Sequence, residues 1–331
     1  MSERDPLIRK IADANPVPED VVRGSGTSPA AEHILEDVIA GRVAVRRVPR
    51  RHLATFAGAG TLLTVIAVVA FGLLDRRAAT AEELLREAAV TAAAAQPAPE
   101  RGPYVYMKTV SDQLTTSDAG GAPWSVILPV VEETWIAPDG SGRIRSVIGK
   151  PRFLGPRDRQ RWEAAGSPEF PAGVSDKPFS SGELVYEDAS SLPNDPVALR
   201  AKLSSQVASE GVPTNVGVFL RVGLLLGRAD ASPELRAALF RVASTLPGID
   251  AVAARTDPLG RDGVGVRMRY MESGARISVV LVFDPRTSRV LSQEQFLLSP
   301  AAWVDAIPGT RVSFVAFVAS DVRESFDGRV R

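Results

Sequence analysis

The chain has 331 residues, 45% of them hydrophobic and 24% charged, and its 39 Lys and Arg residues balance 39 Asp and Glu residues. This composition is typical of globular protein with one large or two smaller domains, and it lacks the basic excess that nucleic-acid binding requires. The chain contains no cysteine, which excludes disulfides and thiol chemistry, and its two histidines, His33 and His52, both lie near the N-terminus.

Residues 1–52 predict a short tail with one amphipathic helix. Ser28 suits an N-cap, Pro29 suits the first helical position and Gly41 suits the end, so the helix is expected at 28–41. Its apolar stripe consists of Ile34, Leu35, Val38 and Ile39. A tail of this length cannot bury the stripe in a core of its own. The stripe is interpreted as a binding surface for a partner protein, with the membrane surface and a second copy of the helix as open alternatives.

Residues 53–74 contain no charged side chain and predict a transmembrane helix. A helix of this length is about 33 Å long, enough to cross a hydrocarbon core of about 30 Å. The run is too long, and too far from the N-terminus, for a cleaved signal peptide. Arginines crowd its N-terminal side, at positions 42, 46, 47, 50 and 51. The positive-inside rule therefore predicts a cytoplasmic N-terminus and an extracytoplasmic domain at 75–331, in a single-pass protein of the cell membrane.

The first part of this domain predicts a helix followed by strands. Thr80 and Glu83 form a capping-box pattern, so a helix is expected from there to just before Pro97. Strands are expected at 104–110, 126–137 and 143–148, the last two of which are separated by a cluster of turn residues.

Residues 149–182 interrupt this pattern with repeated prolines and glycines. They predict a long loop, and loops of this length within a compact domain are typically functional lids, docking segments or disordered. The loop nevertheless contains four aromatic residues, which are Phe153, Trp162, Phe170 and Phe179. These four are the candidate residues of a lid or docking loop, and a tolerated insertion is the alternative.

The rest of the chain predicts helices and then strands. One helix begins after the Asp195-Pro196 pair, the apolar block 216–226 predicts a buried helix, and Ser232-Pro233 begins another. Strands are expected at 264–270, 277–283, 290–298 and 312–319. This order of elements predicts an α+β domain in which helices pack on one face of an antiparallel sheet.

No catalytic, cofactor-binding or metal-binding residues are predicted, and the chain is not expected to be an enzyme. The large domain has neither Cys nor His, which excludes Ser-His-Asp and Cys-His nucleophiles and the usual zinc ligands there. Glu132 and Glu133 are adjacent carboxylates, but neighbours in a strand point to opposite faces and cannot share a proton. Two distant carboxylates of the glycosidase type remain open, although no spacing selects a pair.

Four short stretches carry a resemblance to a family. They are Asn15-Pro16-Val17-Pro18 in the tail, Leu192-Pro193-Asn194-Asp195-Pro196, Pro233-Glu234-Leu235-Arg236 with Pro247-Gly248, and Phe283-Asp284-Pro285-Arg286. Together with the single predicted span, they resemble an uncharacterised family of single-pass membrane proteins from high-GC Gram-positive bacteria, often encoded beside extracytoplasmic-function sigma factors. The resemblance implies a fold and a genomic neighbourhood, and it supplies no functional residue.

Two functions are consistent with this organisation. The first is a regulatory or sensory protein, in which the outer domain binds an envelope ligand and the tail contacts a cytoplasmic partner, with a sigma factor as one candidate. The second is a membrane-anchored binding module similar to lipoprotein carriers, which hold acyl chains on a concave apolar face. The second function predicts an open apolar cavity covered by the 149–182 segment, and it rests on element order alone.

Overall fold

The computed structural model describes residues 79–96, 102–118, 121–184, 188–208 and 211–326. These residues form an α+β unit with a large antiparallel sheet, which confirms the predicted fold class at that level. Within these ranges, no helix combines the length and the apolar character needed to cross a membrane. The predicted helix at 28–41, its four stripe residues and the predicted span at 53–74 all lie outside the described residues.

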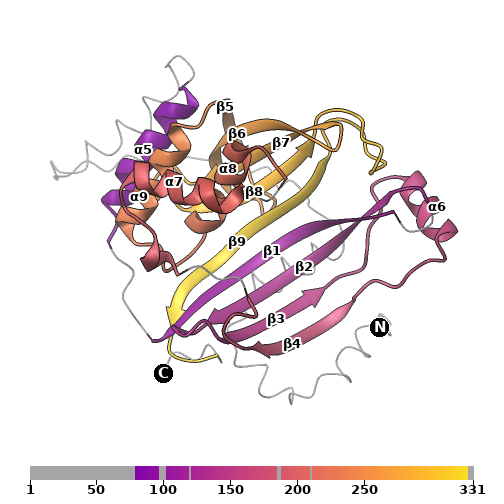
Figure 1. Ribbon diagram of the computed structural model, residues 1–331, viewed down its shortest axis with the longest axis horizontal. Helices are drawn as coiled ribbons and strands as arrows, with labels where there is room; N and C mark the ends of the chain where they lie inside the picture. Colours follow the sequence, from indigo (N-terminus) through magenta and orange to yellow (C-terminus); the bar gives the residue numbers. More distant parts are fainter. Residues whose placement is uncertain (1–78, 97–101, 119–120, 185–187, 209–210, 327–331) are drawn as a thin grey trace, which may run out of the picture. The chain divides into compact units, whose positions relative to one another are not determined.

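The sheet has nine strands in the order β4-β3-β2-β1-β9-β8-β7-β6-β5. The first four are β1 (Tyr104–Ser117), β2 (Trp124–Ile136), β3 (Gly142–Ile148) and β4 (Gly173–Phe179). The other five are β5 (Ile249–Thr256), β6 (Asp262–Glu272), β7 (Ala275–Phe283), β8 (Val290–Leu297) and β9 (Arg311–Arg323). Each group of consecutive strands forms a meander, and the antiparallel pairing of β1 with β9 joins the two meanders (Figure 1).

The helices lie largely between the two meanders in the chain. They are α5 (Ala81–Ala93), α6 (Pro156–Ala164), the short 3-10 helix η1 (Ala189–Ser191), α7 (Pro196–Val207), α8 (Thr214–Leu226) and α9 (Pro233–Ser244). Two of the predicted caps are present: Asp195 accepts a hydrogen bond from the Ala198 backbone N–H, and Ser232 accepts one from Leu235. Each is followed by a proline at the start of its helix, where a missing N–H costs nothing.

The main core lies between these helices and the β5–β9 meander. α8 packs against β6 and β8, α5 packs against α9 and β5, and Figure 1 shows α5, α7, α8 and α9 grouped over this half of the sheet. Phe240 of α9 and Phe283 of β7 are buried with ring centroids 5.5 Å apart. Strand β7 is buried on both faces from Ile277 onward, as its nearly continuous apolar sequence predicts.

Two parts of the chain differ from the sequence predictions. Residues 149–182 are not one long loop, because they contain α6 and β4. β4 pairs with all of β3, and α6 packs against β2, so backbone pairing orders a segment whose polar, Pro-rich sequence suggested a loop. β5 was not predicted, since its sequence is rich in Ala and has little β propensity of its own.

Candidate functional site

The sheet divides between β1 and β9. These strands pair from Tyr104 opposite Arg323 to Asp112 opposite Phe314, and there the pairing ends. Both strands nevertheless continue, β1 to Ser117 alongside β2 and β9 from Arg311 alongside β8. Figure 1 shows the two strands diverging toward this end of the sheet. We call this divergence, between residues 113–117 and 311–313, the split.

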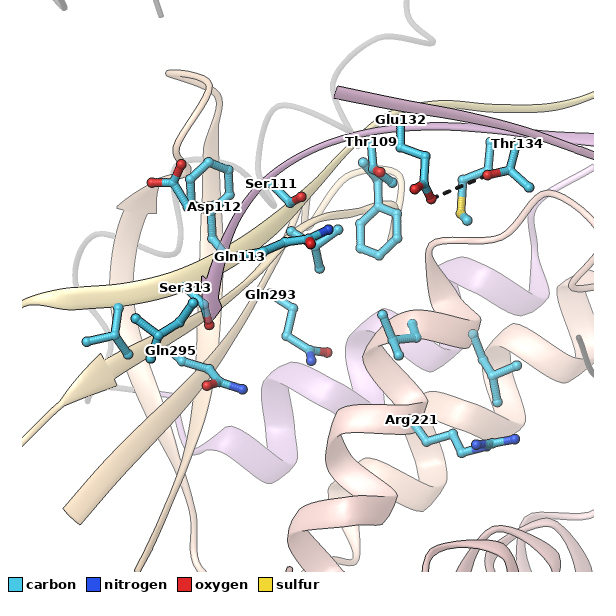
Figure 2. Close-up of a pocket in the computed structure, with 18 of the residues that line it drawn as sticks. Thr109, Ser111, Asp112, Gln113, Glu132, Thr134, Arg221, Gln293, Gln295 and Ser313 are labelled. Carbon is cyan, nitrogen blue, oxygen red and sulfur yellow. Dashed lines mark hydrogen bonds between the residues drawn. The ribbon is translucent and has the colours of Figure 1, made fainter. Parts of the chain in front are cut away.

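A cavity of about 1030 Å³ lies at the split and continues between the strands and helix α8 (Figure 2). Its lining comes mainly from β1, β2, β8, β9 and α8. Apolar lining residues include Met107, Ile136, Leu224, Leu225, Val315 and Phe317. The Leu224 side chain is 48% exposed although it lines the cavity, so the cavity is open to solvent on the α8 side.

Polar side chains share this cavity with the apolar ones. They include Thr109, Ser111, Glu132, Thr134, Gln293 and Gln295. The register explains why several face the same way, because residues directly opposite one another across strands lie on one face. Phe317 is opposite Thr109, which is opposite Glu132, and Val315 is opposite Ser111. The cavity is therefore amphiphilic, which differs from the apolar cavity that the carrier interpretation predicted.

Glu132 and Glu133 lie on opposite faces of β2, as the strand periodicity predicted. Glu132 lines the cavity. Glu133 is on the other face, where the Tyr106 hydroxyl donates a 2.7 Å hydrogen bond to its Oε1 and the Lys108 Nζ lies 3.7 Å away. The two carboxylates cannot act on one substrate atom together, so they do not form an acid–base pair.

Burial raises the pKa of the half-buried Glu132 carboxyl, and a long hydrogen bond of 3.4 Å from the Thr134 hydroxyl opposes this effect. Within the described part of the chain, no Lys or Arg forms an ion pair with Glu132. The other carboxylates of the lining have partners. Asp112 receives a 2.8 Å hydrogen bond from Arg152, and Glu272 receives one of 2.9 Å from the Tyr270 hydroxyl.

Gln293 fits against α8 at a glycine. Its side chain is 8% exposed, and its Oε1 has no hydrogen-bond partner among the described residues. A Cβ on Gly223 would overlap this oxygen, so a larger residue at position 223 would require the amide to move. The Trp303 Nε1, also at the cavity, likewise has no partner in the described ranges. A buried amide oxygen and an indole N–H without partners are unusual in a packed core, and both border this cavity.

The four candidate lid residues separate into two groups. Phe153, Trp162 and Phe170 form one aromatic cluster with Trp124, in which Phe153 lies 5.4 Å and Phe170 lies 6.0 Å from Trp162 between ring centroids. Phe179 lies apart from it, on β4 opposite Gly142. Residues 149–182 contribute nothing to the described cavity lining, so the cover that the carrier interpretation expected from them is not part of that lining.

The aromatic cluster is fixed in place by Asp158 of α6. Asp158 is fully buried and accepts hydrogen bonds from the backbone N–H groups of Ser125, at 3.2 Å, and Asp305, at 2.8 Å. Asp305 in turn forms an ion pair of 2.8 Å with Arg157. These contacts connect α6 to β2 and to the β8–β9 connection, so this part of the expected loop is structurally integrated.

The sequence did not predict most of the cavity residues. The sequence marks Glu132 only as one of two adjacent carboxylates, and it does not distinguish Thr109, Ser111, Gln293 and Gln295 from other polar strand residues. Thr109 and Ser111 lie two positions apart on β1, and Gln293 and Gln295 lie two positions apart on β8, so each pair shares a face of its strand. Polar residues also occupy the opposite face of both strands, so this pattern does not single out the cavity residues. No family model matches the chain, and no curated protein matches it.

Proposed function

We propose that residues 79–326 form a binding module for an amphiphilic ligand, attached to the cell membrane through the predicted span at 53–74. The observation that carries the proposal is the amphiphilic cavity of about 1030 Å³ beside the split. This volume lies at the upper end of the range for ligand sites, which are typically concave and mainly apolar, with a few placed polar groups.

The lining indicates which kind of ligand fits. Leu224, Leu225 and Phe317 offer apolar surface from α8 and β9, and Thr109, Ser111 and Gln293 offer hydrogen-bonding groups from the strands. A purely apolar ligand would leave these polar groups unpaired, at a cost of about 1–3 kcal/mol for each buried group. A fully polar ligand would gain nothing from the apolar wall. A lipid with a hydrogen-bonding head group satisfies both parts.

The wider role that we propose is sensory. The ligand would be an envelope molecule bound outside the membrane, and the tail at 1–52 would contact a cytoplasmic partner, for which a sigma factor is one candidate. The alternative is a membrane-anchored carrier, in which ligand binding is the whole function and the tail is only an extension of the anchor. Both roles require the same cavity to hold the ligand.

Photo-crosslinking in cells tests the binding proposal on the intact chain. Cells that express the chain are fed a fatty acid bearing a diazirine and an alkyne, irradiated, and the crosslinked peptides of the purified protein are identified by mass spectrometry. We expect crosslinks on β1, β9 and α8 peptides in addition to those on the predicted span. Crosslinks confined to 53–74 would contradict the proposal.

Two exposed apolar helix residues provide a matched pair of variants. Leu224 lines the cavity, whereas Val197 on α7 is 78% exposed and does not line it. Leu224→Asp places a charge on the apolar wall, where burial against an acyl chain is unfavourable. We expect cavity crosslinks to fall about tenfold in Leu224→Asp and to stay unchanged in Val197→Asp, with the crosslinks on the span as an internal reference in both.

A further inference from the structure

Glu132 occupies an unusual electrostatic position inside the cavity. It extends from the middle of β2, opposite Thr109, and its carboxylate is half-buried. The single hydrogen bond that it makes to a described residue is the long one from Thr134. A buried carboxylate normally has a cation or several strong donors, because removing its charge from water without compensation is unfavourable.

The remaining charges of the lining do not supply this compensation. Arg228 uses its guanidinium on Asp230, with its Nη2 2.5 Å and its Nε 2.9 Å from the two carboxylate oxygens. Arg221 lies on α8, on the side of the cavity away from Glu132 (Figure 2), and no arginine or lysine of the described residues is among the causes that shift the pKa of Glu132. Among the described carboxylates of the cavity, Glu132 is the one without a strong donor.

We propose that Glu132 recognises a positively charged amine on the ligand of this cavity. This inference rests on the proposed function, and it names the chemistry of the ligand's polar end. An ammonium group has three N–H donors, so it can bond the Glu132 carboxylate and still donate to neighbouring oxygens. Thr109 and Ser111 present hydroxyl oxygens on the same face, and Leu224 and Phe317 offer the apolar surface that an attached chain needs.

A divalent cation does not fit this position as well as an amine. Calcium requires six to eight oxygen ligands, commonly from several carboxylates, and magnesium requires near-octahedral geometry. No group of three or more acidic or histidine side chains suited to a metal occurs in the described ranges. One carboxylate beside hydroxyl and amide groups is the arrangement that suits an organic cation.

Two matched photoreactive probes test the inference. One is a long-chain primary alkylamine bearing a diazirine and an alkyne, and the other is the same molecule with its nitrogen acetylated and therefore neutral. Each is added to the intact chain in lipid discs of zwitterionic phosphatidylcholine. Crosslinks on cavity peptides are measured relative to crosslinks on the 53–74 peptide, which corrects for probe concentration in the bilayer.

Glu132→Gln and Glu133→Gln are the matched variants, since both remove one carboxylate from neighbouring positions of one strand. We expect Glu132→Gln to lower cavity labelling by the amine about tenfold or more, because hydrogen bonds to charged groups are the stronger class. Glu133→Gln is expected to leave it unchanged. The acetylated probe should label the cavity equally in the wild-type chain, Glu132→Gln and Glu133→Gln. The amount should match the labelling of Glu132→Gln by the amine probe.

The outcomes separate the inference from the proposal on which it rests. If both probes label the cavity and neither depends on Glu132, the inference is wrong and the amphiphile-binding function stands. If neither probe labels the cavity in the wild-type chain, the binding function itself is wrong. Equal loss in both glutamine variants would overturn the inference, because it would reflect a structural effect of changing β2.

Discussion

Glu132 and Glu133 show at the scale of single residues how environment separates two identical side chains. Glu133 accepts a hydrogen bond from Tyr106 and lies near Lys108, whereas Glu132 faces the cavity and, among the residues with described positions, accepts only the weak bond from Thr134. Burial raises the pKa of Glu132 in the folded chain above its value in the unfolded chain. The folded state therefore binds this proton more tightly than the unfolded state does.

The sign of the pH effect follows from this difference. As the pH rises from the pKa of Glu132 in the unfolded chain through its raised pKa in the folded chain, the free energy of unfolding falls. Above the raised pKa, the folded chain carries the full cost of burying the ionised Glu132 carboxylate. Glu132→Gln removes the penalty, so at pH 7.5 we expect the ligand-free variant to be more stable by up to about 1 kcal/mol. Urea unfolding of the intact chain in discs should show this gain shrinking toward pH 4. Glu133→Gln, which weakens an existing contact, should give no gain at either pH.

Gly223 and Gln293 provide a second test at this scale. In Gly223→Ala the new Cβ would lie 1.9 Å from Gln293 Oε1 and 3.1 Å from Leu281, so the amide must move. Alanine favours the helix over glycine by about 1 kcal/mol, and we expect the overlap to exceed this gain and give a net loss of about 1 kcal/mol in unfolding free energy. Gln293→Ala in the same chain should recover part of it. Additive losses in the double variant would show that the two residues do not contact each other in the way described.

At the scale of elements, the connection between α6 and the sheet depends on Asp158. Asp158→Ala leaves the backbone N–H groups of Ser125 and Asp305 without their acceptor, so we expect a loss of about 2–4 kcal/mol. Hydrogen exchange should increase in α6 and around Asp305 more than in β7. Glu163→Ala, on an exposed position of α6, is expected to change stability by less than about 0.5 kcal/mol. Equal exchange in both variants would contradict this role for Asp158.

The elements with strong local signals were predictable from the sequence. α7 and α9 begin with an Asp-Pro and a Ser-Pro pair whose side chains form caps, and β7 is a continuous apolar run between turns. α6 and β4 were not predictable, because Asp158 becomes a buried acceptor only once residues distant in the chain approach it. β1 was predicted to end at Val110, whereas pairing with β2 extends it through polar residues to Ser117.

The cavity could not be predicted for a related reason. Its walls join residues from Met107 to Phe317, and its opening depends on where β1 and β9 stop pairing, which no local pattern encodes. Strand periodicity did predict that Glu132 and Glu133 face opposite ways. It did not indicate which face would border a cavity, since that depends on the position of α8.

At the scale of the whole molecule, the sensory role makes a prediction about the tail. Deleting residues 1–45 is expected to remove a cytoplasmic protein that crosslinks to the intact chain in membranes. The four-residue substitution Ile34→Ser, Leu35→Ser, Val38→Ser and Ile39→Ser should have the same effect if the predicted stripe forms the contact. An unchanged set of crosslinked proteins in both variants would favour the carrier alternative over the sensory role.

The central claim is that the cavity holds an amphiphile, and native mass spectrometry of the intact chain tests it most directly. The chain is released in the gas phase from discs of its own membrane, and bound molecules are read as added mass. We expect a discrete adduct that persists after bulk lipid is removed, is lost in Leu224→Asp and is retained in Val197→Asp. If the wild-type chain carries no adduct, or if Leu224→Asp carries the same adduct as the wild-type chain, the cavity does not hold an amphiphile.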